Sequence, residues 1–409
     1  MQTQLAPQYQ NTPEGLEAEA ILRKCVHCGF CTATCPTYQL LGDELDGPRG
    51  RIYLIKQVLE GAQPTRKTQL HLDRCLTCRN CETTCPSGVQ YGHLVDIGRK
   101  IVDEQVPRPA GEKALRWALK EGLPSPFFAP AMKLGQAVRG LLPAKLQNKV
   151  PQPRPSGAWP KRTHARQVLM LAGCVQPAMA PNINTATARV LDAAGIQAVI
   201  APEAGCCGAV KFHLNDQAGG LAQMRRNIDA WWPHVEAGVE ALVMNASGCG
   251  VTVKDYGHHL QHDPDYAEKA ARISALTRDL SELLPELVPA LKAHLGGKRP
   301  GTLAYHPPCT LQHGQQLRGG VETHLAELGF DIGVARTEPH LCCGSAGTYS
   351  VLQPDISYEL RDRKLKNLTE LQPQAIVSSN IGCITHLQSG TATPVRHWVE
   401  VLDEALQLA

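Results

Sequence analysis

The sequence predicts a multidomain α+β protein, and two observations carry that prediction. In the N-terminal quarter, the spacing C-x₂-C-x₂-C-x₃-C-P occurs twice, from Cys25 to Pro36 and from Cys75 to Pro86. In the C-terminal half, a pattern of strands, helices and a Cys-Cys-Gly turn also occurs twice. We therefore expect an α-helical two-4Fe-4S ferredoxin domain followed by two repeated α/β Cys-Cys-Gly units.

The cysteine spacing has a chemical reason. Two intervening residues allow one tight turn to direct successive thiolates at one iron–sulfur cluster, and the fourth Cys of each run typically ligates the other cluster. The expected ligands are Cys25, Cys28, Cys31 and Cys85 for cluster 1, and Cys35, Cys75, Cys78 and Cys81 for cluster 2. Zinc knuckles and a disulfide framework are the alternatives, but zinc sites usually show two C-x₂-C pairs.

Helices are expected before and after each cysteine run, so the ferredoxin domain is assigned to residues 1–105. Apolar periodicity predicts helices at 13–23, 49–60 and 89–104, and a short helix at 68–74. In the second of these, Ile52, Ile55, Val58 and Leu59 share one face, and Gly61 follows where a C-terminal cap is expected.

Residues 106–165 are predicted to be a basic, proline-rich linker with short helices at 112–121 and 131–142. Ten prolines lie in this segment, and residues 106–166 carry twelve basic and two acidic side chains. That is a net charge of +10, which leaves −7 for the rest of the chain. The charge suggests an anionic surface nearby, either phospholipid or an acidic partner. The second helix is either an interfacial membrane helix or, as its length favours, a helix packed on the neighbouring domain.

The internal repeat assigns residues 166–297 to Cys-Cys-Gly repeat 1 and 298–409 to Cys-Cys-Gly repeat 2. Strands are expected at 168–171, 197–200 and 241–244 in the first copy, and at 302–305, 331–334 and 375–378 in the second. The alternation with helices at 184–194 and 320–328 predicts a small parallel sheet in each copy, and residues 263–297 are expected to be largely helical.

Eight cysteines of the repeat should meet at the carboxyl ends of these strands, where α/β sheets bind ligands. They are Cys174, Cys206, Cys207, Cys249, Cys309, Cys342, Cys343 and Cys383. A further iron–sulfur cluster, redox-active thiols and buried hydrophobic cysteines all fit this pattern. The nearby His213, His306, His313 and His386 are interpreted as polar core or cap residues. His27, in the first run, either tunes a cluster through an N–H···S bond or is exposed.

Several protein classes are disfavoured by the sequence. No signal peptide and no apolar stretch of membrane-spanning length is found, and sixteen cysteines without a secretory signal indicate a reducing compartment. Neither C-x₂-C is followed by His, which excludes c-type haem attachment by pattern. No G-x-G-x-x-G lies between a strand and a helix, and no helix-turn-helix candidate is present, so we expect no nicotinamide or flavin site and no nucleic acid partner.

The two cysteine runs, the segment 46–52 and the Cys-Cys-Gly repeats resemble the iron–sulfur subunits of membrane-associated respiratory dehydrogenases. Residues 25–38, 204–209 and 227–232 look like those of the glycolate oxidase iron–sulfur subunits, and the likeness extends over nearly the whole chain. One departure concerns heterodisulfide reductase relatives, in which the repeat ends in a C-x-x-C pair that helps to hold a non-cubane cluster. Here Thr252 and His386 stand where that last Cys is expected.

The resemblance implies an electron-transfer subunit of an oxidoreductase complex that acts on the CH–OH group of a 2-hydroxy acid. Two flavin-type subunits are the implied partners, with FAD on them and not on this chain, and glycolate would be oxidised to glyoxylate there. This chain would pass the electrons to a membrane acceptor such as quinone, and we expect peripheral attachment to the cytoplasmic face of the inner membrane. The alternatives are an equivalent subunit for D-lactate, glycerol 3-phosphate or a heterodisulfide, and an iron–sulfur regulator or scaffold.

Overall fold

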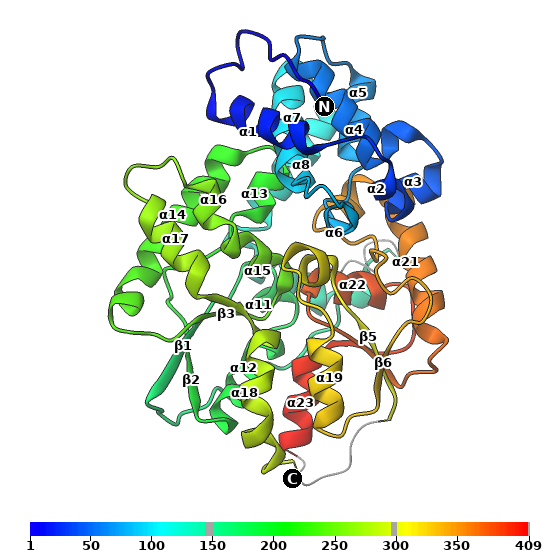
Figure 1. Ribbon diagram of the computed structural model, residues 1–409. Coiled ribbons are helices and arrows are strands. Elements are labelled where there is room, and N and C mark those ends of the chain that lie inside the picture. Colours follow the sequence, from blue (N-terminus) through cyan, green and yellow to red (C-terminus); the bar gives the residue numbers. More distant parts are fainter. Residues whose placement is uncertain (144–146, 148–149, 296–300, 408–409) are drawn as a thin grey trace.

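The computed structural model describes residues 1–143, 147, 150–295 and 301–407 of the 409-residue chain. The first part, which we call the ferredoxin unit, is built from helices at the top of Figure 1. They are α1 (Pro13–Lys24), α2 (Phe30–Ala33), α3 (Pro36–Leu41), η1 (Glu44–Asp46), α4 (Pro48–Leu59), α5 (Arg66–Asp73), α6 (Asn80–Thr84) and α7 (Tyr91–Gln105).

The helices predicted around the cysteine runs are present, and local sequence explains their limits. Thr12 caps α1 by accepting a hydrogen bond from the Gly15 N–H at 3.1 Å, and Pro13 occupies the first turn, where its missing N–H is not needed. The predicted apolar face of α4 is buried against α7, and Gly61 has the left-handed φ of 101° that ends a helix.

Residues 166–295, the first copy, contain a four-stranded parallel sheet in the order β2-β1-β3-β4. Its elements are β1 (Arg166–Met170), α11 (Gln176–Met179), α12 (Asn182–Ala193), β2 (Ile196–Val199), α13 (Ala209–His213), α14 (Gln217–Glu236), β3 (Leu242–Met244), α15 (Ser247–Lys254), α16 (Tyr256–His259), α17 (Ala267–Leu276), β4 (Thr277–Asp279) and α18 (Leu280–Lys292).

Residues 301–407, the second copy, contain an equivalent parallel sheet in the order β6-β5-β7-β8. Its elements are β5 (Leu303–His306), η3 (Thr310–Gly314), α19 (Gly320–Glu327), β6 (Ile332–Val334), α20 (Tyr349–Leu352), α21 (Pro354–Thr369), β7 (Ala375–Ser378), α22 (Ile381–Gln388), β8 (Val395–His397) and α23 (Trp398–Gln407). Part of the predicted boundary between the copies, at 297 and 298, lies outside the described residues.

Each sheet has a fourth strand that the sequence did not predict. The segment 263–297 was expected to be largely helical, but β4 interrupts its helices, and β8 precedes the last helix of the second copy. Both strands have three residues with Arg in the middle, which is too short for strand periodicity to stand out from the neighbouring helical pattern. They form because β3 and β7 offer an open edge for parallel pairing.

The two sheets share one layer of helices between them (Figure 1). Helices α12 and α18 of the first copy pack against α23 and α19 of the second copy, and side chains from both sheets belong to the same apolar core. The two copies therefore form one body. The ferredoxin unit lies over the end of this body where the cysteines that follow β1, β3, β5 and β7 are found.

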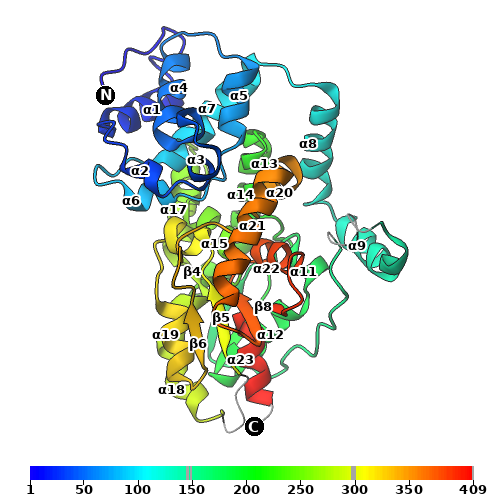
Figure 2. The ribbon, with the colours of Figure 1, turned by 90° about the vertical axis from the view of Figure 1, so that its right-hand side faces the viewer.

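The linker runs along one side of the molecule (Figure 2) and contains α8 (Ala110–Gly122), α9 (Phe128–Ala137) and η2 (Arg139–Leu141). Helix α9 contacts α11, in agreement with the packed alternative, yet Phe127, Leu134 and Leu141 are 79%, 67% and 87% exposed. In the described part of the chain, no helix is both long enough and apolar enough to cross a membrane.

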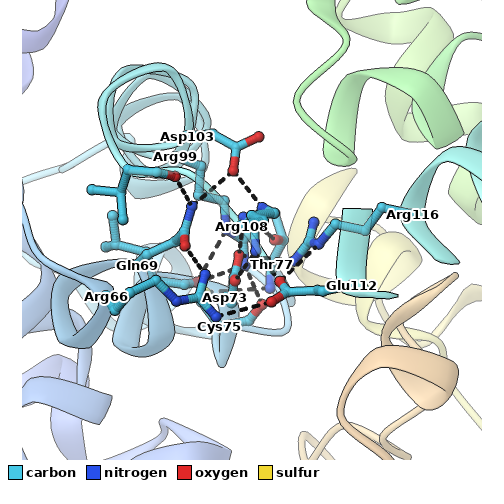
Figure 3. Close-up of polar contacts among 12 residues, drawn as sticks. Arg66, Gln69, Asp73, Cys75, Thr77, Arg99, Asp103, Arg108, Glu112 and Arg116 are labelled. Carbon is cyan, nitrogen blue, oxygen red and sulfur yellow. Dashed lines mark hydrogen bonds and ion pairs between the residues drawn. The ribbon is translucent and has the colours of Figure 1, made fainter. Parts of the chain in front are cut away.

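Much of the linker's positive charge is neutralised by acids of the units that it joins, which the sequence did not predict. Arg108 is nearly buried and pairs with Asp73, Asp103 and Glu112, as Figure 3 shows. The same occurs further along, in the pairs Arg116–Asp73, Lys120–Asp216, Arg154–Glu400, Arg162–Asp192 and Arg166–Glu240. The basic linker is therefore in large part an electrostatic strap across the molecule.

Candidate metal centres

The two cysteine runs fold into the same loop. In each loop two residues between the first and third Cys have left-handed backbone angles: His27 and Gly29 in the first, and Thr77 and Arg79 in the second. Alternating right- and left-handed residues turn consecutive N–H groups toward one point and form a concave anion site, as at many iron–sulfur centres. A short helix, α2 or α6, then begins and carries the third Cys.

The first set of thiols contains cysteines from both runs. Burial raises the pKa of Cys31 to about 11, and the neighbouring thiols act in the same direction; these are Cys25, Cys28 and Cys85. All four line one hollow, whose wall also includes Val26, Phe30 and Tyr91. The structure thus brings together the four residues that the sequence assigned to cluster 1. A metal centre would remove the thiol protons, because a coordinating thiol is deprotonated.

The second set lies deeper. Burial raises the pKa of Cys81, and the neighbouring Cys78, Cys75 and Cys35 raise it further. The two sets are adjacent, because Cys35 and Cys85 each reach across to the other run and Thr34 Oγ1 lies 3.1 Å from Thr84 Oγ1. Four converging thiols and an inward-facing loop backbone fit a 4Fe-4S cluster at each set.

Two buried arginines give the second set a positive environment. Burial would raise the pKa of Cys75, but the charges of Arg51 and Arg99 keep it below its ordinary value. Arg99 is held by the Leu72 carbonyl oxygen (2.8 Å from Nη2), the Cys75 carbonyl oxygen (2.5 Å from Nη2) and Thr77 Oγ1 (2.9 Å from Nη1), as Figure 3 shows.

Arg51 is 1% exposed and donates to the His71 carbonyl oxygen and to Thr37, while Asp46 lies 3.4 Å from its Nη2 atom. The sequence marked the segment 46–52 through its likeness to relatives and did not indicate what these charges do. Arg99 carried no signal at all, because it lies on the helix that follows the second run, at a distance that no cysteine spacing reveals.

The second copy gathers four thiols and one imidazole at the ends of β5 and β7. His306, Cys343 and Cys383 have ligand atoms that all lie within 4.8 Å of one another, a grouping that could hold a metal ion. Neither ring nitrogen of His306 has a hydrogen-bond partner among the described residues, although the side chain is fully buried. Cys309 and Cys342 are in hydrogen-bond contact beside this group.

The histidines of the repeat therefore divide into two kinds. His213 pairs with Asp96 at 3.5 Å, His313 bonds to the His340 carbonyl oxygen at 3.1 Å, and His386 bonds to Ser357 at 3.1 Å. These three are the polar residues that the sequence suggested. His306 differs, since its ring faces thiols without a hydrogen bond. His27 is half-buried beside Tyr53, with ring centroids 6.3 Å apart.

The first copy brings its four cysteines together without a histidine. Cys174 Sγ lies 3.5 Å from Cys206 Sγ, and this hydrogen bond lowers the pKa of Cys206. Cys207 in turn contacts Cys249. Leu171, three residues before Cys174, occupies the position of His306, which lies three residues before Cys309. The two copies thus have the same thiol arrangement and different neighbours.

Glycine completes each Cys-Cys-Gly turn for a steric reason. Gly344 has φ of 87°, and a Cβ atom there would lie 2.3 Å from the Ser357 carbonyl oxygen. Gly208 has φ of 98°, and its Cβ would lie 2.9 Å from the Gly220 carbonyl oxygen. Only a residue without a side chain allows the turn to approach the next helix this closely.

The second thiol set of the ferredoxin unit lies against the cysteines of the second copy. Cys78 and Leu76 pack in one apolar cluster with side chains of that copy, which are Cys309, Leu341, Cys342, Tyr349, Ile356 and Leu360. Two hydrogen bonds fix the contact, from Tyr349 to the Arg74 carbonyl oxygen at 3.0 Å and between Thr83 and His313 at 3.1 Å.

The domain content agrees with this geometry. Residues 21–89 match the 4Fe-4S dicluster domain family, and residues 168–254 and 303–388 match the cysteine-rich domain family. The fold and the thiol sets therefore define an iron–sulfur protein that combines one dicluster domain with two cysteine-rich domains.

Full-length relatives specify the family further. The chain is 56% identical to the glycolate oxidase iron-sulfur subunit of Escherichia coli strain K12, over 100% of both chains. It is 30% identical to the probable glycolate oxidase iron-sulfur subunit of Bacillus subtilis strain 168, over 94% of this chain and 92% of that one. This chain belongs to the family of glycolate oxidase iron–sulfur subunits. Lactate utilization protein A of Geobacillus thermodenitrificans strain NG80-2 is 26% identical over 58% of this chain and 98% of that one.

Proposed function

We propose that this chain is the electron-transfer subunit of a glycolate oxidase complex, in which flavin-containing partner subunits oxidise glycolate to glyoxylate. The observation that carries the proposal is the pair of adjacent four-cysteine sets in a chain that is 56% identical, end to end, to a glycolate oxidase iron-sulfur subunit. A 4Fe-4S cluster, when bound, takes up and releases one electron at a time. The chain would relay electrons toward a membrane acceptor such as quinone.

In this proposal the residues of each set have defined tasks. Cys25, Cys28, Cys31 and Cys85 hold cluster 1, and Cys35, Cys75, Cys78 and Cys81 hold cluster 2. Arg51 and Arg99 offset the negative charge of the four thiolates of the second set. The apolar side chains around Cys78 exclude water from that set, which strengthens the electrostatic effect of both arginines.

The proposed division of the chain follows the sequence boundaries: 1–105 for the ferredoxin domain, 106–165 for the linker, 166–297 and 298–409 for the repeats. Its support is that α7 ends at Gln105, β1 begins at Arg166 and the family matches fall inside these limits.

The function is tested on the complex, purified anaerobically with its partner subunits. The expected result is that glycolate bleaches the visible charge-transfer absorbance, and that Cys28→Ser and Cys78→Ser each remove about four of eight iron atoms and prevent bleaching of the affected set. Cys174→Ser, which changes a thiol outside both sets, serves as the control and should retain both signals. Bleaching by D-lactate or glycerol 3-phosphate but not by glycolate would contradict the proposed substrate.

We further propose peripheral attachment to the cytoplasmic face of the inner membrane through α9. Phe127, Leu134 and Leu141 are exposed, and Lys133 and Lys113 have no ion pair with any described residue. Replacing the three apolar residues by Ser should release the protein from washed membranes, whereas Leu16→Ser, at an exposed position of the ferredoxin unit, should not. Equal release of both variants would refute the role of α9.

A further inference from the structure

The first cysteine run presents an uncovered apolar face next to its thiols. Val26 and Phe30, which flank Cys28, are 68% and 61% exposed, and Cys28 is itself exposed. Tyr53 of α4 lies beside them, close to His27, and is 47% exposed. A large apolar group normally turns away from water, so a contiguous exposed apolar face beside reactive thiols indicates an interaction surface.

The second cysteine run shows what covers the equivalent face. Leu76 stands in the second run where Val26 stands in the first, one residue after the leading Cys, yet it is only 6% exposed. Asn80 takes the position of Phe30 and is 3% exposed. The cover over Leu76 and Cys78 is the thiol-bearing end of the second copy. Within one chain, therefore, the same loop is covered by a thiol-bearing body on one side and open on the other.

We propose that the face formed by Val26, Cys28, Phe30 and Tyr53 is the docking surface for the flavin-containing subunit that donates electrons to this chain. The proposal rests on the proposed function and adds to it the place of entry. Electron transfer requires donor and acceptor groups to come close, and Cys28 is the most exposed of the eight thiols in the two sets. The second set cannot receive a protein partner at its apolar face, since the second copy already occupies it.

The surface suits a redox partner in size and chemistry. Electron-transfer contacts are at the small end of protein interfaces, below about 1,200 Å², and a few apolar and aromatic side chains at their centre supply most of the affinity. Arg49 and Glu44 at the rim form an ion pair at 2.7 Å and so add little net charge. An apolar protein face is therefore a better match than a strongly charged carrier.

The test uses the complete complex with two substitutions, Val26→Ser and Phe30→Asn. The second installs the residue type that the chain itself carries at position 80 of the equivalent loop, so the loop should still fold. We expect the affinity for the flavin subunits to fall by about tenfold or more and the rate of bleaching by glycolate to fall in parallel at limiting concentration. Iron content and the extent of reduction by dithionite should not change.

Phe127→Asn is the matched control, because Phe127 is at least as exposed as Phe30 but lies on the linker. It should leave affinity and bleaching rate unchanged. Unchanged affinity in the Val26→Ser, Phe30→Asn variant would overturn the inference, as would normal bleaching by glycolate combined with slow reoxidation by quinone. Failure of the unsubstituted complex to be reduced by glycolate, D-lactate or glycerol 3-phosphate would instead refute the proposed function.

Discussion

Replacing Arg99 by Met should shift the reduction potential of the second cysteine set and leave that of the first set unchanged. The guanidinium of Arg99 is 8% exposed and donates to the carbonyl oxygen of Cys75, a residue of the second set. A positive charge near a metal centre favours the reduced, more negative state. Its removal should therefore make the potential more negative.

The magnitude follows from Coulomb's law. For an effective dielectric constant of about 20 and a separation of about 8 Å, one unit charge contributes about 2 kcal/mol. This corresponds to about 90 mV for a one-electron couple, for which a tenfold change in the equilibrium constant is about 59 mV. Met has a similar length and no charge, so packing changes little.

The assay is a redox titration of the complex followed by electron paramagnetic resonance, in which the two sets are separated by their spectra. Arg99→Lys is the control: it keeps the charge, loses the fork that binds Leu72 and Cys75, and should shift the potential by less than half as much. Arg99→Met should also lower the free energy of unfolding by about 1–3 kcal/mol, because carbonyl groups lose their donors. A shift below about 20 mV, or equal shifts of both sets, would refute the electrostatic account.

Three further variants test the fold. His397 is buried neutral with a pKa of about 3; since the unfolded chain takes up its proton near pH 6.5, stability should fall as pH drops below 6.5, by about 2 kcal/mol at pH 5, and His397→Asn should remove this part of the urea-unfolding pH profile. Gly344→Ala should destabilise by at least about 2 kcal/mol and more than Gly208→Ala, because its Cβ would come closer to backbone; thermal melts that rank them in reverse would contradict this. Arg108→Ala should lower the free energy of unfolding by about 3 kcal/mol, and the fully exposed Arg162→Ala should cost less in the same denaturant titration.

Local patterns predicted most of the secondary structure, because they reflect interactions between residues close in the chain. The apolar periodicity of α4 and the cysteine spacing of the two runs both belong to this kind. Strands β4 and β8 escaped prediction, since three residues such as Thr277–Asp279 carry no period of their own and take strand geometry only from β3 and β7.

The linker illustrates a different limit. Its net charge of +10 is a correct count and suggested an anionic surface. The fold instead places Asp73, Asp192 and Glu400 opposite its arginines, and those acids are distant in sequence. Charge totals do not show which charges are paired, because pairing depends on which surfaces the fold brings together.

The sequence by itself determined which residues can form the two thiol sets and which strands carry the cysteines of the repeat. These follow from spacing and periodicity, which act over a few residues. Only the tertiary structure decided which of two nearly identical loops is covered. Val26 and Leu76 have equivalent positions, yet one is 68% and the other 6% exposed. The difference arises because side chains more than 230 positions further along the chain, such as Cys309, pack on Leu76, and no local pattern encodes such a contact.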